Sequence, residues 1–135
     1  MHTLTIQTRG RGTLDITEEV DALVRDSGIK LGLCTAFIQH TSASLLITEN
    51  ADPTVRRDLE AWLERAIVDG DPLFDHTAEG PDDMPAHVRS ALLATSLSIP
   101  IQSGRLALGT WQGLFLYEHR TRPHQRRVLV LLQAS

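Results

Sequence analysis

The sequence predicts an α+β fold: one compact domain over residues 1–135, in which a mixed or largely antiparallel sheet packs with two main helices and one short helix. The segments follow the order strands, helix, strands, helix, helix, strands, instead of the strict alternation that is typical of a doubly wound sheet. The 135 residues are 41% hydrophobic and 22% charged, which suits a single buried core. Neither a repeat nor a second domain is indicated.

The N-terminal segment predicts two short strands and a helix. Residues 2–8, HTLTIQT, alternate Leu and Ile with polar residues, which is the period of a strand with one buried face. After a turn at residues 9–12, a second strand should lead to a helix capped by Thr17. Gly28 is expected to end this helix, because glycine adopts the left-handed backbone conformation at low cost.

The middle of the chain predicts two strands and the longest helix. Residues 31–38 form an apolar run typical of a central strand, and residues 44–48 form another strand after a polar interruption. Asp52 is the expected cap of the helix, with Pro53 at its first position, because a proline there loses no hydrogen bond. The helix should end near Gly70, with its charged residues on a solvated face.

Residues 76–87, HTAEGPDDMPAH, combine two histidines and three carboxylates with a glycine and two prolines, a mixture that no hydrophobic core requires. The stretch predicts a loop that runs into a short helix ending near Thr95, with Asp83 or Met84 as the cap ahead of Pro85. An ordinary polar surface loop with a capped helix is the alternative interpretation.

The C-terminal third predicts three strands, at residues 97–101, 114–119 and 127–133. Because strand side chains alternate between faces, His119 is expected on the same face as Phe115.

Composition disfavours several partners. The formal net charge of −4 provides no general attraction to nucleic acid or to anionic membranes, and no apolar run approaches transmembrane length. Cys34 is the only cysteine, so no intrachain disulfide can form, and the first residues lack the pattern of a signal peptide. We therefore expect a cytoplasmic protein with no nucleic-acid or membrane partner.

Four histidines sit at predicted loops or strand ends: His40, His76, His87 and His119. Imidazole clusters suit zinc, iron, nickel or copper, so a metal site assisted by Asp83 or Glu79 is a physical hypothesis. The spacing of Asp83 and His87, four residues apart in a helix, would let both side chains point at one ligand.

Strongly specific signatures are absent from the sequence. It contains no HExxH pair, no CxxC pair and no Gly-rich phosphate loop. Cys34 lies inside an apolar run, which favours a buried structural thiol over a reactive one. The hydroxyls of Thr41, Ser42 and Ser44 could donate to an anion, whereas no nucleophile-elbow pattern supports a hydrolase.

Several blocks resemble the YjbQ family over nearly the whole chain. They are an early GRG, HTSASLLITEN at residues 40–50, HTAEGPDDMPAH at 76–87, LGTWQG within 98–120 and the closing strand. The resemblance implies a compact α+β subunit, a homotrimer and a metal-containing site near subunit boundaries. One departure is Asp75, which precedes His76 where a YxHxxEG pattern leads us to expect an aromatic residue nearby.

The resemblance also implies a secondary thiamine-phosphate synthase activity, which would join a pyrimidine diphosphate to a thiazole phosphate and release pyrophosphate. The residues that it assigns are catalytic Asp83, Glu79, His40 and Gln112, substrate-binding Thr41, Ser42, Trp111 and Arg120, and metal-binding His76, His87 and His119. The expected cofactor is a divalent metal ion, a transition metal such as zinc. Mg²⁺ would suit a diphosphate substrate, but it prefers oxygen ligands over imidazoles.

Two hypotheses of function follow. The chain is a metal-dependent enzyme acting on a small phosphorylated metabolite, or it is a non-catalytic trimeric protein whose polar pocket holds a metabolite or an ion. Histidine clusters flanked by hydrogen-bond donors favour the enzyme.

Overall fold

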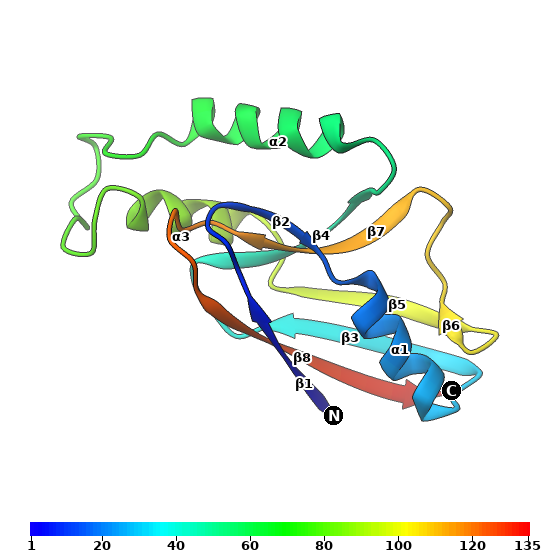
Figure 1. Ribbon diagram of the computed structural model, residues 1–135. Helices are drawn as coiled ribbons and strands as arrows, with labels where there is room; N and C mark the ends of the chain where they lie inside the picture. The colour runs from blue at the N-terminus through cyan, green and yellow to red at the C-terminus, as the bar shows by residue number, and fades with distance from the viewer.

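Two antiparallel sheets pack against each other in the computed structural model, which describes residues 1–135 (Figure 1). The larger sheet has the strand order β1-β8-β3-β5-β6, and the smaller one has the order β2-β7-β4. The strands are β1 His2–Gln7, β2 Gly12–Asp15, β3 Leu31–Ile38, β4 Ala43–Glu49, β5 Ser96–Gln102, β6 Arg105–Leu106, β7 Gln112–Glu118 and β8 Gln125–Ala134. The helices are α1 Thr17–Ser27, α2 Pro53–Ala66 and α3 Asp83–Leu92. The predicted α+β class with antiparallel pairing is confirmed, with the strands divided between two sheets.

The main core lies between the two sheets. Cys34, Ala36 and Ile38 of β3 face Leu114 and Leu116 of β7, and all five are buried, as the period-two alternation of strand side chains requires. Helix α1 adds buried valines to this core and closes it at one end. Cys34 is thus the buried thiol that the sequence predicts, and burial raises its pKa to about 11.

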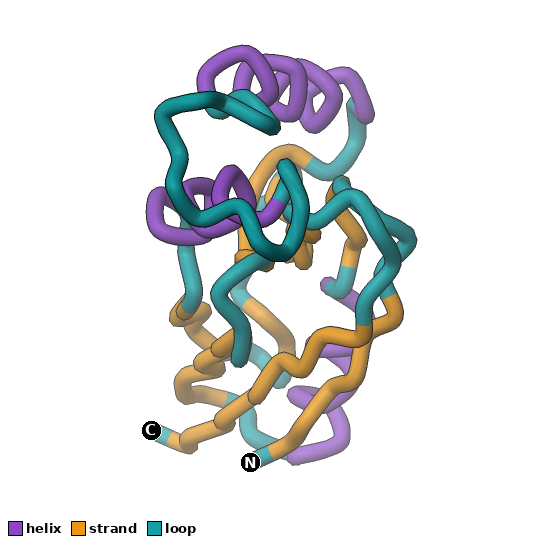
Figure 2. The backbone as a smooth tube through the Cα atoms, turned by 90° about the vertical axis from the view of Figure 1, so that its left-hand side faces the viewer, coloured by secondary structure: helices purple, strands orange, loops and turns teal.

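A second, smaller core lies on the opposite face of β7, beneath α2 and α3. Tyr117 packs there against Leu63 and Ile67, and Phe115 and His119 point to the same side of the strand. Figure 2 shows α2 and α3 stacked together at one end of the molecule, while both chain termini lie at the other end. The expected sharing of one face by Phe115 and His119 is therefore confirmed.

Helix α1 begins differently from the prediction. Thr17 is its first residue and Ile16 is the capping residue, without a side-chain cap. The Thr17 hydroxyl instead accepts a hydrogen bond from the backbone N–H of Leu114, which ties α1 to β7. Gly28 ends the helix in the left-handed conformation, with φ 74°, as expected.

Helix α2 begins as predicted and ends early. The Asp52 carboxylate accepts from the N–H of Thr54, with Pro53 next to the cap. The helix ends at Ala66 because Ile67 turns to an extended conformation and buries its side chain in the smaller core. Gly70 lies beyond the helix, in a turn with φ 72°.

Helix α3 begins one or two residues before the predicted position. Asp82 is the capping residue and Asp83 the first helical one, so Pro85 is at the third position. The Asp82 carboxylate makes no cap, because Arg120 and Thr121 already donate to it. Helix α3 ends at Leu92, where the chain straightens into β5.

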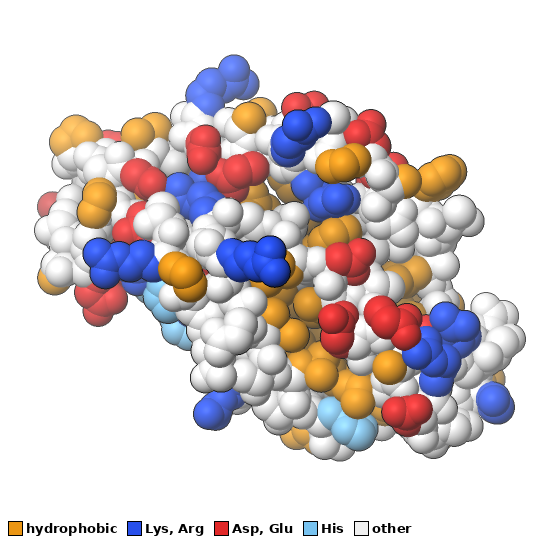
Figure 3. Space-filling model, in the orientation of Figure 1, with side chains coloured by type: hydrophobic (Ala, Val, Ile, Leu, Met, Phe, Trp, Pro, Cys, Tyr) orange, Lys and Arg blue, Asp and Glu red, His pale blue; other side chains and the backbone are white.

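The outer face of α2 mixes acidic and basic side chains, and Figure 3 shows both kinds interspersed over this helix. This agrees with a solvated helix surface. None of the three helices is long and apolar enough to cross a membrane.

Candidate functional site

His76, Asp83 and His87 form a compact cluster at the start of α3. Nε2 of His76 lies 2.7 Å from Oδ2 of Asp83, and Nε2 of His87 lies 3.3 Å from the same oxygen. One ligand atom from each of the three residues lies within 4.8 Å of the others. Asp83 is buried, while His76 is half exposed, so one side of the cluster is open to solvent. The expected proximity of Asp83 and His87 across one helical turn is confirmed.

The donor set of this cluster fits a transition metal. Two imidazoles and one carboxylate, with further positions left for water or substrate, are typical of catalytic zinc and related ions. Nδ1 of His87 lies 3.1 Å from the backbone oxygen of Thr41. Because a carbonyl can only accept, Nδ1 carries the proton in this contact, which leaves Nε2 as the nitrogen that could bind a metal. A hydrogen bond of this kind is the usual partner of a metal-binding histidine.

Arg120 holds the acidic side of the cluster. It donates to Asp83 Oδ1 at 3.0 Å, to Asp82 Oδ2 at 2.9 Å and to the backbone oxygen of Glu79 at 2.9 Å. The hydrogen bond to Asp82 is the main reason why the pKa of Arg120 is raised. Burial would raise the pKa of Asp82, but the hydrogen bonds from Arg120 and Thr121 outweigh it and lower that pKa to about 2.

These contacts involve two of the predicted site residues. Arg120 is expected to bind substrate, but its guanidinium donates hydrogen bonds to two carboxylates and a backbone carbonyl of this chain. Glu79, expected to be catalytic, has an exposed carboxylate 3.9 Å from Arg120.

His40 and Thr41 form part of the wall of a neighbouring cavity of about 310 Å³. The cavity is lined by His40, Thr41, His87, Ser90, Ala91 and Thr95. Nδ1 of His40 accepts from the backbone N–H of Ser42 at 3.1 Å and lies 3.0 Å from the Ser42 hydroxyl. Burial, followed by the charge of Arg126, lowers the pKa of His40. Ser42 is itself buried, so it supports His40 and does not face the cavity.

A buried ion pair lies behind Ser42. Glu118 accepts from Nε of Arg126 at 2.9 Å and from the Thr8 hydroxyl at 2.7 Å, and the Arg126 guanidinium also donates to Ser42 Oγ at 3.0 Å. Burial would raise the pKa of Glu118, but the hydrogen bonds from Arg126 and Thr8 outweigh it and lower that pKa. Sequence reasoning missed this pair. A signal was available, because Glu118 continues the core-facing side of β7 after two buried leucines.

His119, expected to bind metal, is not part of the cluster. It is fully buried, its Nε2 lies 2.8 Å from the Ser44 hydroxyl, and its ring packs on Tyr117 at 4.7 Å. Burial, reinforced by the charges of Arg89, Arg11 and Arg126, lowers its pKa to about 3. His119 is therefore a neutral core histidine.

Trp111 and Gln112 lie at the other end of β7 from the cluster. Trp111 is 63% exposed, and Oε1 of Gln112 accepts from the N–H of Gly109 within its own turn. The structure does not bring these two residues to His76, Asp83 and His87.

Two further cavities flank the cluster and α2. One cavity, of about 310 Å³, is lined by His76 and by Pro72, Phe74, Pro81 and Met84. Phe74 occupies the aromatic position of the YxHxxEG pattern, two residues before His76, so the expectation that Asp75 removes this aromatic side chain is wrong.

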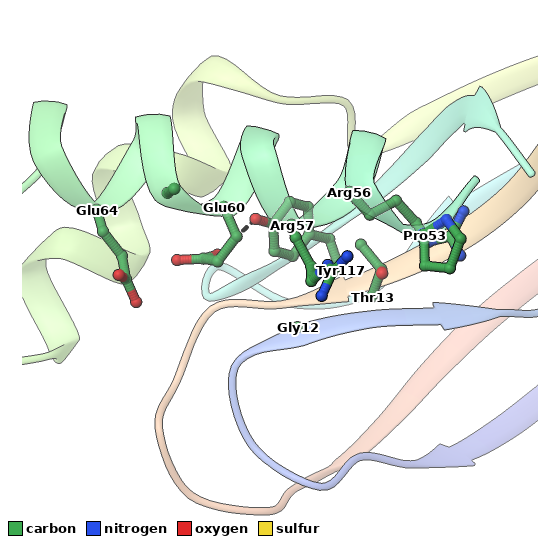
Figure 4. A pocket seen from close by; sticks show the side chains of 9 residues that line it. Gly12, Thr13, Pro53, Arg56, Arg57, Glu60, Glu64 and Tyr117 are labelled. Carbon is green, nitrogen blue, oxygen red and sulfur yellow. Dashed lines mark hydrogen bonds between the residues drawn. The ribbon is translucent and has the colours of Figure 1, made fainter.

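The other cavity, of about 380 Å³, lies between α2 and β2 (Figure 4). Arg57 and Glu64 project toward it from α2, and Glu60 accepts from the Tyr117 hydroxyl and from buried Arg89 at its inner wall. Glu60 therefore belongs to an internal network, although the sequence predicts a solvated residue. None of the predicted site residues lines this cavity.

Comparisons with known proteins agree on one family. Residues 2–135 match the family of YjbQ-like UPF0047 proteins. The chain is 54% identical over 127 residues to UPF0047 protein sll1880 of Synechocystis sp., an alignment that covers 94% of this chain and 86% of the relative. It is 43% identical over 134 residues to UPF0047 protein YjbQ of Escherichia coli O157:H7, covering 98% and 96%.

Solved structures have the same fold. A YjbQ/UPF0047 family protein of Clostridium acetobutylicum superimposes with a TM-score of 0.90 at 34% identity, covering 98% of this chain and all of that one. A conserved hypothetical protein of Thermus thermophilus superimposes with a TM-score of 0.88, also at 34% identity and the same coverage.

Proposed function

This chain belongs to the YjbQ family, and from that premise we propose that it is a metal-dependent enzyme acting on a small phosphorylated substrate. The observation that carries the proposal is the cluster of His76, Asp83 and His87, whose ligand atoms lie within 4.8 Å of one another beside two cavities. A bound divalent metal would neutralise charge on a phosphoryl oxygen. Two imidazoles favour a transition metal such as zinc over Mg²⁺.

The chain's own residues supply binding and positioning around that ion. Arg120 holds Asp83 at one of its oxygens and leaves the other facing the histidines. The cavity shared by His76 and Phe74 offers an apolar wall that suits the ring of a heterocyclic substrate. Exposed Glu79 is the nearby carboxylate that can act as a general base. A thiamine-phosphate synthase reaction, which joins two such heterocycles, is one reaction that this arrangement would serve.

The metal content of the purified, untagged protein tests this proposal. We expect about one transition-metal ion per chain by inductively coupled plasma mass spectrometry, and its loss in His87→Ala and in His76→Ala. His124→Ala is the matched control, because His124 lies on the β7–β8 turn outside the cluster. Wild-type protein that stays metal-free after incubation with zinc would contradict the proposal.

We also propose that copies of the chain assemble into a homotrimer through the outer face of the five-stranded sheet. Exposed Leu33 and Phe37 of β3 lie on this face on either side of Thr35, which pairs with exposed Leu131 of β8, and Pro100 of β5 pairs with Leu33. A contiguous apolar sheet face of this kind marks an interface. Light scattering should give a trimer for the wild type and a smaller species for Leu131→Asp, whereas Trp62→Asp on exposed α2 should remain trimeric. An unchanged mass for Leu131→Asp would refute this interface.

A further inference from the structure

We propose that His40 is a fixed, neutral hydrogen-bond donor that binds an anionic oxygen, such as that of a phosphoryl group, in the cavity between Thr41 and α3. This inference rests on the proposed function and extends it, because it adds His40 as a second contact for the substrate's anionic group, next to the metal cluster. It gives His40 a role other than that of a base or a metal ligand.

The proton on the His40 ring follows from its neighbours. The backbone N–H of Ser42 can only donate, and it points at Nδ1 from 3.1 Å. Nδ1 must therefore offer a lone pair, and in a neutral imidazole the proton then resides on Nε2. A base or a metal ligand at Nε2 would need the lone pair there, which this tautomer does not have.

The buried ion pair enforces the same tautomer from a second direction. Arg126 donates to Ser42 Oγ at 3.0 Å, which uses that oxygen as an acceptor and leaves its hydrogen free to point at Nδ1, 3.0 Å away. Glu118 fixes Arg126 in turn through two hydrogen bonds. Arg126 thus donates to Ser42, and Ser42 donates in turn to His40. Arg126 and Glu118 are positioning residues, since neither reaches the cavity.

The position of the ring suits an anion shared with the metal cluster. His40 and His87 line the same cavity, together with the polar residues Thr41, Ser90 and Thr95. The Thr41–Ser42 peptide group contacts both histidines: its carbonyl accepts from Nδ1 of His87, and its N–H donates to Nδ1 of His40. An oxygen bound in this cavity can accept from Nε2–H of His40 while it lies beside His87.

Nuclear magnetic resonance on metal-free, ¹⁵N-labelled protein tests the tautomer directly. We expect His40 Nδ1 to resonate as an unprotonated nitrogen and Nε2 as a protonated one at neutral pH, with the assignment made by comparison with His40→Gln. A protonated Nδ1, or a doubly protonated ring, would overturn the proposal.

Titration with inorganic phosphate tests the ligand. Phosphate should shift the His40 Nε2–H signal, and His40→Ala should weaken phosphate binding about 10-fold, the typical effect of losing one hydrogen bond to a charged group. His40→Gln should retain most of the affinity, because its amide can place an N–H near the position of Nε2 but cannot act as a base. Equal losses in both variants, or no shift with phosphate, would overturn the assignment.

These readouts are independent of the metal proposal. If His40 variants bind zinc like the wild type while phosphate binding follows the donor pattern, both proposals stand. If the protein never binds zinc but still shows the fixed tautomer and the phosphate response, the metal proposal is wrong and the proposal that His40 is a hydrogen-bond donor stands.

Discussion

The His76–Asp83–His87 cluster and the Glu118–Arg126 pair use similar chemistry in opposite ways. In the pair, both side chains are buried and the carboxylate accepts from Arg126, Thr8 and the backbone of the following residues. In the cluster, the carboxylate is buried but His76 is half exposed and His87 lines a cavity. A charge with every hydrogen bond satisfied internally can only hold the structure, whereas one with an open side can bind a ligand. The contrast separates positioning residues from candidate ligands.

The largest effect is expected from Glu118→Gln. Removing the carboxylate leaves the buried Arg126 guanidinium without a counter-charge, which typically costs about 3–5 kcal/mol. Urea unfolding should detect this as a lower midpoint. Exposed Glu64→Gln serves as the control and should stay within about 0.5 kcal/mol of the wild type. Equal stability of the two variants would mean that the pair is not structural.

Asp83→Asn should weaken metal binding. The amide keeps the shape of the carboxylate but loses its charge, so zinc affinity measured by competition with a chelating dye should fall by at least about 100-fold, the upper end of the loss typical of removing an outer partner of a ligand. Asp75→Asn, at an exposed position beside His76, should change the affinity little. If Asp83→Asn bound zinc like the wild type, the cluster would not be the metal site.

His119→Gln should change the dependence of stability on pH. Because the folded-state pKa of His119 is about 3, below the ordinary value of 6.5, the unfolded chain binds the proton first. Stability should therefore fall as pH drops below 6.5, by about 1.4 kcal/mol per pH unit and by roughly 2 kcal/mol at pH 5. The free energy of unfolding of His119→Gln, measured at pH 7 and pH 5, should not show this loss. The surface variant His124→Gln should retain it.

Arg120→Lys should have the smallest effect of the four. A lysine cannot donate to Asp82, Asp83 and the Glu79 carbonyl at once, so Asp83 loses a fixed orientation. Zinc affinity should drop about 10-fold, as is typical for a residue that orients a ligand. Arg122→Lys, two residues along and exposed, controls for the change of side chain. A loss as large as that of Asp83→Asn would show that Arg120 does more than orient.

Local spacing made much of the fold and part of the site predictable. Alternation placed Phe115 and His119 on one face of β7, and the Asp52–Pro53 pair marked the start of α2. Asp83 and His87 could be paired because helical geometry alone brings them together. These predictions depend only on residues that are close in sequence.

Long-range contacts account for what the sequence did not predict. Glu118 and Arg126 meet only because β7 and β8 belong to different sheets that pack together, and Thr8 reaches them from the end of β1. His119 resembled a ligand by residue type, but burial beneath α2 and α3 makes it a core residue. Asp82, and not Asp83 or Met84, is the capping residue of α3, and its carboxylate accepts from Arg120, 38 residues away in sequence, in place of a helix N–H.

The acidic segment held by Arg120 has a consequence for the order of events at the site. Glu79, Asp82 and Asp83 bring three carboxylates against one guanidinium, so this surface repels a phosphorylated molecule as long as the histidines are neutral. A divalent cation cancels the remaining negative charge. The encounter with an anionic substrate is then no longer opposed, so we expect a bound cation to raise the affinity for a phosphorylated substrate above the weaker phosphate binding of the metal-free protein.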